Sequence, residues 1–68
     1  MNEVWIARYL TYHHPGEEEF PTLEEAIGFL AWGEEAGRLA GMAIIAPDGS
    51  VALDGERLDR ALAERLDA

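Results

Sequence analysis

The fold of this chain is decided by residues 17–37, which read EEEFPTLEEAIGFLAWGEEAG. Thr22 is a strong helix N-cap, and Glu25 three residues later completes a Thr-Leu-Glu-Glu capping box. Gly37 is placed to end the helix, because glycine accepts the left-handed conformation that commonly follows a helix C-terminus. The stretch therefore predicts one central helix that begins after Thr22 and ends before Gly37.

The apolar arc of this predicted helix is wider than one sheet can cover. Four residues at helical spacing form a compact stripe: Leu23, Ala26, Ile27 and Leu30. Phe29, Trp32 and Ala36 widen the arc to more than half of the circumference, whereas a helix that packs on one sheet needs about 100°. Two roles are open for Phe29 and Trp32: aromatic residues of the core, or anchors that insert into a partner. We expect the surplus, centred on Trp32, to contact something other than the sheet.

A strand and a tight turn are predicted before the central helix. Residues 3–12 (EVWIARYLTY) are rich in aromatic and β-branched residues, which is typical of a strand. Neither alternating face of this strand is clearly polar, so we expect both to be at least partly covered, by the protein itself or by a partner. Pro15 and Gly16 suit the central positions of a type II turn, after which residues 17–20 return as a short, charged edge strand. The alternative is that residues 17–20 form a loop.

A second hairpin and a last helix are predicted after the central helix. Residues 41–46 and 51–53 have strand character, and Pro47-Asp48-Gly49-Ser50 forms the turn between them. Asp54 is placed to cap the last helix. The apolar face of that helix consists of residues at helical spacing: Leu58, Ala61, Leu62 and Leu66.

These elements predict the order ββαββα. Two hairpins joined by a helix most simply merge into one antiparallel sheet. We therefore expect residues 1–68 to form a single α+β domain, with three or four short strands and both helices packed on one face of the sheet.

The chain is short, acidic and free of cysteine. It has 68 residues, of which 14 are acidic and five are basic, for a net charge of −9. The absence of cysteine excludes disulfides and thiolate zinc sites. The negative charge disfavours direct binding to nucleic acid or to an anionic membrane, because like charges repel, and it favours a basic protein partner. Residues 1–10 lack the character of a signal peptide, and no apolar run approaches the roughly 20 residues of a membrane span, so we expect a cytoplasmic protein.

The residue types that carry catalysis or bind metals form no convincing motif. His13 and His14 precede three glutamates, but neighbours on a strand point to opposite faces, and a zinc site needs three or four convergent ligands. Ser50 is the one serine, and together with Asp48 and His13 or His14 it supplies the residue types of a hydrolytic triad. It follows a turn glycine without the context of a nucleophile elbow. We therefore expect a protein that is not an enzyme and that binds no metal and no cofactor.

The acidic residues are concentrated in the first half of the chain. Residues 1–37 contain eight acidic residues and one basic residue, a net charge of −7, whereas residues 38–68 contain six and four, a net charge of −2. The stretch from 17 to 35 holds seven glutamates without an internal counter-charge: Glu17, Glu18, Glu19, Glu24, Glu25, Glu34 and Glu35. Because a helix rises 1.5 Å per residue, the pairs at 24–25 and 34–35 are about 15 Å apart. Such a display could replace phosphates in a channel lined by arginine and lysine, or it could serve only solubility.

A small, cysteine-free, strongly acidic α+β domain with these seven glutamates resembles the inhibitors that bacteriophages and mobile elements encode against nucleic-acid machines. Anti-CRISPR and anti-restriction proteins that mimic DNA are the nearest type. The resemblance implies that the glutamates would occupy the site where a Cas or restriction complex grips DNA, and would block target recognition by competition. It makes the seven glutamates expected partner-binding residues, and the wide apolar arc of the central helix adds Phe29 and Trp32 to them.

The competing interpretation is a structural or assembly protein. It would form a homodimer through Trp32 or through the outer face of the sheet, and its acidity would serve only solubility.

Overall fold

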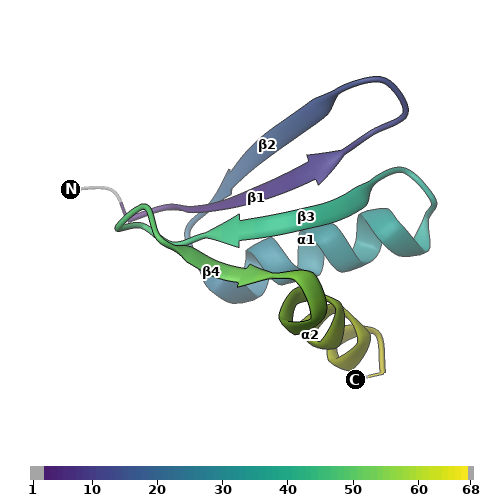
Figure 1. Cartoon of the computed structure of the whole chain (residues 1–68). Coiled ribbons are helices and arrows are strands. Elements are labelled where there is room, and N and C mark those ends of the chain that lie inside the picture. The colour runs from purple at the N-terminus through teal and green to yellow at the C-terminus, as the bar shows by residue number, and fades with distance from the viewer. Residues whose placement is uncertain (1–2, 68) are drawn as a thin grey trace.

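In the computed structural model, which describes residues 3–67, the chain forms one four-stranded sheet and two helices that pack on the same face of it (Figure 1). The elements in chain order are β1 (Trp5–Leu10), β2 (Pro15–Phe20), α1 (Leu23–Glu35), β3 (Ala40–Ile45), β4 (Val51–Asp54) and α2 (Gly55–Asp67). The predicted α+β fold with the order ββαββα is confirmed. Residues 15–20 pair with β1 over their full length, so the alternative in which residues 17–20 form a loop is wrong.

The strands lie in the order β2-β1-β3-β4, and every neighbouring pair is antiparallel. Residues directly opposite each other on neighbouring strands share a face of the sheet, and the faces alternate along each strand. Ala7 and Ile44 are such a pair, and both are buried under the helices. Ile6 and Ile45 are the next pair, on the outer face, which is the face turned away from both helices. Each central strand therefore has one face that the helices cover and one that they leave open.

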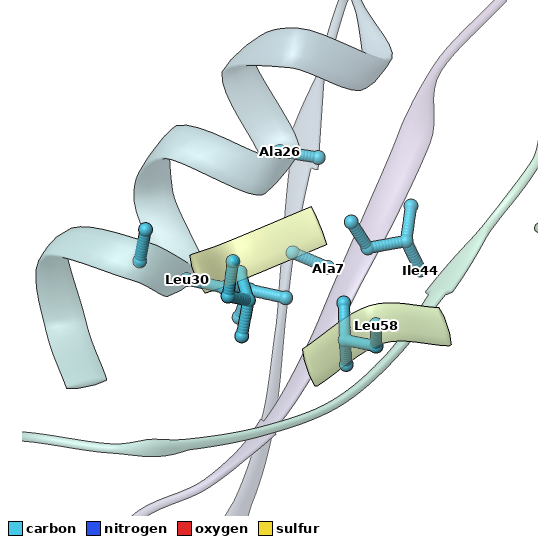
Figure 2. Packing of buried hydrophobic residues seen from close by; sticks show 7 residues of the cluster. Ala7, Ala26, Leu30, Ile44 and Leu58 are labelled. Carbon is cyan, nitrogen blue, oxygen red and sulfur yellow. The ribbon is translucent and has the colours of Figure 1, made fainter. Parts of the chain in front are cut away.

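The core lies between the sheet and the two helices. Its buried members come from both helices and both central strands: Ala7, Ala26, Leu30, Ala31, Ile44, Leu58 and Leu62. Leu30, Ile44 and Leu58 are the largest of these side chains, and Figure 2 shows them converging from α1, β3 and α2. Because burial of one such side chain contributes about 1.5–3 kcal/mol, these contacts are the main attachment of both helices to the sheet.

The wide apolar arc of α1 is mostly used inside the protein, because α1 packs against the sheet and against α2 at once. Phe29 takes part in an aromatic cluster, with its ring centroid 5.5 Å from that of Tyr9 and 5.1 Å from that of Phe20. Trp32 is the one large apolar side chain of α1 that stays mainly in solvent, with 56% of its surface exposed. Of the surplus residues that the sequence predicts, Phe29 is covered by aromatic residues of β1 and β2, whereas Trp32 and the small Ala36 stay exposed.

The local signals for the two ends of α1 and for the second turn are confirmed. The backbone N–H of Glu25 donates a hydrogen bond of 3.1 Å to Thr22 Oγ1, which is the predicted N-cap. Gly37 adopts a φ of 71° directly after α1, as a left-handed C-terminal glycine should. In the turn between β3 and β4, Gly49 has a φ of 90°, and its N–H donates to the carbonyl of Ala46 at 2.9 Å.

The turn between β1 and β2 lies earlier than the sequence predicts. Thr11 closes it by donating two hydrogen bonds of 2.9 Å, from its N–H and from its hydroxyl, to the carbonyl of His14. Pro15 and Gly16 already belong to β2, so the type II turn predicted at these residues is wrong. Gly16 meets a packing demand instead, because it pairs with Tyr9 and a Cβ on it would lie 2.5 Å from atoms of the tyrosine ring.

Candidate partner-binding surfaces

The first of the seven glutamates has a counter-charge that the sequence does not reveal. Glu17 lies opposite Arg8 in the pairing of β1 with β2, and Arg8 Nε is 2.9 Å from Glu17 Oε2. Both side chains are more than half exposed, at 56% and 54%, so water screens the pair and its contribution to stability is at most about 1 kcal/mol. The expectation that no glutamate has an internal counter-charge is wrong for Glu17, because the register of the β1–β2 hairpin decides which side chains lie opposite each other, and it places Glu17 against Arg8.

Two further glutamates accept hydrogen bonds within the protein itself. Glu34 Oε2 accepts a hydrogen bond of 2.7 Å from the backbone N–H of Gly41, which ties the end of α1 to the start of β3. Glu25 belongs to the cap, where the Thr22 hydroxyl lies 3.4 Å from Glu25 Oε2. These carboxylates stabilise the fold, so a partner that bound them would have to break their internal hydrogen bonds.

The remaining four glutamates are exposed: Glu18, Glu19, Glu24 and Glu35. Across residues 3–67, the structure gives their side chains no hydrogen bond or ion pair. Glu24 and Glu35 are eleven residues apart on α1, so they point in nearly the same direction and lie about 16 Å apart along the axis. Glu18 and Glu19 lie on the edge strand β2, which packs beside α1. These four residues are called the exposed carboxylates below.

The two aromatic residues expected to bind a partner have different surroundings. Phe29 packs against the core and is part of the aromatic cluster described above. Trp32 stays exposed, and the guanidinium carbon of Arg38 lies 5.5 Å from the centroid of its ring. This cation–π contact places a positive charge over one face of the indole. Trp32 is therefore the exposed aromatic of the pair, and it already has one neighbour.

The outer face of the sheet forms a second candidate surface. Its residues lie side by side across the strands in three rows, which are Glu19, Ile6, Ile45 and Val51; Glu17, Arg8, Ala43 and Asp54; and Pro15, Leu10 and Ala40. Met42 joins them because a bulge in β3 inserts it between the residues opposite Arg8 and Tyr9, and it lines the same hollow as Ala43 and Ile45. This set of residues is called the outer sheet face below.

Large apolar side chains on the outer sheet face are exposed. Leu10, Met42 and Val51 have 46%, 54% and 55% of their surface in solvent. A shallow hollow of about 690 Å³ runs over the face from β2 to β4. Exposed apolar residues that gather on one face are typical of a protein interaction site. The sequence indicated that β1 needs cover on both sides, and the structure supplies that cover on one side only.

The residues considered for catalysis or metal binding do not form a site in the described part of the chain. His13 and His14 lie in the exposed turn before β2, with ring centroids 6.2 Å apart. Ser50 donates from its hydroxyl at 2.6 Å and from its N–H at 2.9 Å to Asp48 Oδ1, and these bonds hold the pKa of the Asp48 carboxyl below its usual value. Within residues 3–67, no three histidine, aspartate or glutamate side chains are grouped to hold a metal ion. Neither α1 nor α2 has the length and apolar character that crossing a membrane requires.

No family model matches the chain, and comparisons with curated proteins and with solved structures find no similar protein.

Proposed function

We propose that this chain is a non-enzymatic binding protein that inhibits a nucleic-acid-binding machine, such as a CRISPR–Cas effector, by presenting a DNA-like carboxylate surface. The observation that supports the proposal is the set of exposed carboxylates on β2 and α1, which have no partner inside the described chain. The partner is a basic protein surface that otherwise grips phosphates. In this mechanism the glutamates compete with DNA for that surface.

The strength of the effect depends on how many carboxylates act together. A carboxylate and a guanidinium 4 Å apart attract each other by about 1 kcal/mol in water, and by more where a cleft excludes water. DNA carries a charge about every 1.7 Å of its axis, so the carboxylates of α1 copy only part of its charge density. Several contacts are therefore needed, and the net charge of −9 adds long-range attraction to a basic cleft.

The proposal is tested by competition with DNA. Purified CRISPR–Cas and restriction complexes are each loaded with a fluorescently labelled duplex target, and displacement by the protein is followed by fluorescence anisotropy. We expect displacement from at least one complex, with an affinity that falls steeply as salt rises from about 50 mM to about 200 mM. Failure to displace DNA from any complex at low salt would contradict the proposal.

Charge reversal at two positions identifies the surface. Glu24→Lys combined with Glu35→Lys should weaken displacement at least about tenfold, which corresponds to about 1.4 kcal/mol. Glu34 is avoided, because its carboxylate holds Gly41. The matched control is Asp59→Lys combined with Asp67→Lys on the exposed side of α2. Each reversal adds two charges, so both pairs change the net charge from −9 to −5. Equal losses in the two double variants would show that net charge, and not this surface, is responsible.

A further inference from the structure

We propose that the outer sheet face is a docking groove for one basic amphipathic helix of the partner protein. The inference rests on the proposed function, which supplies a basic partner, and it names the surface and the partner chemistry. The exposed carboxylates attract and orient the partner, whereas the outer sheet face provides the apolar contact. Glu19 belongs to both, because it points to the outer side of β2.

The centre of the outer sheet face is apolar. Ile6, Ile45 and Val51 lie side by side in one row, and Ala43 lies in the next row. Arg8 is the one base in that second row, and Glu17 neutralises it at 2.9 Å. The middle of the face therefore offers an apolar strip without an unpaired positive charge to repel a basic partner.

Acidic residues border this strip at both edges of the sheet. Glu19 stands on β2, beside Glu17, whose charge Arg8 already balances, and Asp54 stands on β4 at the end of the row that contains Glu17. Three strand spacings separate β2 from β4, which is about 14 Å. A helix with its side chains is about 10–12 Å wide, so a helix lying along the strands would have carboxylates on both flanks.

The dimensions and charges of the face fit a single helix of defined pattern. The six-residue strands are about 20 Å long, which a helix of about 14 residues matches. Its apolar stripe would contact the strip, and lysine or arginine on each side of the stripe would reach the acidic borders. The charge pattern of the groove thus selects a helix with an apolar stripe between two basic flanks.

A second copy of this chain fits the same face poorly. In a face-to-face dimer with its two-fold axis along the strands, β2 of one copy lies over β4 of the other. That arrangement places Glu19 of one copy over the apolar Val51 of the other, without a counter-charge, and it brings two chains of charge −9 together. Like charges that face each other across an interface cost several kcal/mol. Charge complementarity therefore favours the basic helix over self-association.

The probe is a synthetic peptide of about 14 residues, the length of the groove, with leucine at positions i, i+3, i+4 and i+7 and lysine on both flanks. A peptide of the same composition with a scrambled order is the control. Titration into ¹⁵N-labelled protein, followed by NMR, should shift the amide signals of Ile6, Ala43 and Ile45. The scrambled peptide should bind at least tenfold more weakly. Equal binding of both peptides, or shifts confined to α1, would overturn the proposal.

Two substitutions test the apolar contact while adding attraction for the peptide. Met42→Glu and Val51→Glu should each weaken peptide binding at least tenfold, although each adds a negative charge. Leu66→Glu is the matched control, because Leu66 is also a large apolar residue that is 47% exposed, compared with 54% and 55% for Met42 and Val51, and it lies on α2, on the other side of the sheet. The control variant should bind the peptide as the parent protein does. Unchanged binding by Met42→Glu and Val51→Glu would reject the groove.

Self-association is the rival outcome, and sedimentation velocity decides it. A dimer that Met42→Glu dissociates would assign the outer sheet face to a second copy and overturn the proposal, whereas a monomer supports it.

The peptide titration and the DNA competition together separate this inference from the proposed function. Peptide docking without displacement of DNA from any complex would refute the inhibitor role and leave the groove standing, whereas displacement of DNA without peptide docking would refute the groove alone.

Discussion

The carboxylate of Glu34 accepts a hydrogen bond of 2.7 Å from the backbone N–H of Gly41, and so joins the last turn of α1 to the first residues of β3. This contact gives Glu34 and Glu35 different roles, although they are adjacent residues of the same type. Glu34 is partly buried and holds the fold, whereas its neighbour Glu35 is exposed. The difference leads to the first of four predictions.

Glu34→Gln should destabilise the protein, and Glu35→Gln should not. A hydrogen bond to a charged group contributes about 1.5–3 kcal/mol, and the glutamine amide replaces it only in part, so we expect a loss of about 1 kcal/mol or more in the free energy of unfolding. Surface substitutions such as Glu35→Gln usually stay within about 0.5 kcal/mol. Urea denaturation followed by circular dichroism measures both variants, and equal midpoints would refute the structural role of Glu34.

Gly16→Ala should destabilise the protein through contact with Tyr9. A Cβ at residue 16 would lie 2.5 Å from ring atoms of Tyr9, and overpacking of this kind costs about 1–3 kcal/mol. The same substitution should cost much less in a Tyr9→Leu background, where the ring is absent. A double-mutant cycle on the free energy of unfolding measures the coupling, and additive effects of the two changes would contradict the close approach.

Two glycines, one inside α1 and one just after it, should respond to alanine in opposite directions. Gly37 has a φ of 71°, a conformation that costs an alanine about 1 kcal/mol, so Gly37→Ala should lower the melting temperature. Gly28 lies inside α1, and a Cβ on it would lie 3.2 Å from its nearest neighbour, the flexible end of Arg65. Gly28→Ala should therefore stabilise the helix by up to about 1 kcal/mol. Differential scanning calorimetry of the two variants tests the pair, and a shift of the same sign in both would be inconsistent with these geometries.

Asp48 should titrate below its ordinary pKa because of Ser50. The Ser50 hydroxyl and then the Ser50 backbone N–H donate to its carboxylate and lower the pKa from the ordinary value of 3.8. Since the folded-state pKa is depressed, the stabilisation is present above pH 3.8 and is lost as the pH falls through the folded-state pKa. NMR titration of the Asp48 carboxyl carbon measures the shift. Ser50→Ala should move the pKa back toward 3.8, and an unchanged value would remove Ser50 as the cause.

The sequence predicts this protein best where one short segment contains the whole interaction. Thr22 and Glu25 are three residues apart, so their capping contact needs only the start of a helix. Gly37 and Gly49 are required by local backbone conformation, and both have positive φ. The Pro15-Gly16 pair predicts a turn that does not form there, because glycine is not confined to turns. Gly16 lies in a strand, where the ring of Tyr9 on the neighbouring strand leaves no room for a Cβ.

The candidate surfaces, too, are predictable from the sequence only in part. The excess of glutamate in residues 17–35 is visible in the sequence, but which glutamates are available to a partner depends on contacts with Arg8 and Gly41, which belong to neighbouring elements of the fold. The outer sheet face could not be predicted residue by residue. Strand register and the side on which both helices pack decide which half of each alternating strand is left uncovered.

The sequence by itself therefore determined the element order, the ends of α1 and the charge, because capping and periodicity act over a few residues. Only the tertiary structure decided how residues 17–37 are used. Pairing of β2 with β1 engages Glu17, and docking of α1 on β3 engages Glu34. Packing of α1 on the sheet and beside α2 covers most of the apolar arc and leaves Trp32 exposed. Each of these outcomes depends on how one element pairs with or packs against another, and local propensity does not encode that arrangement.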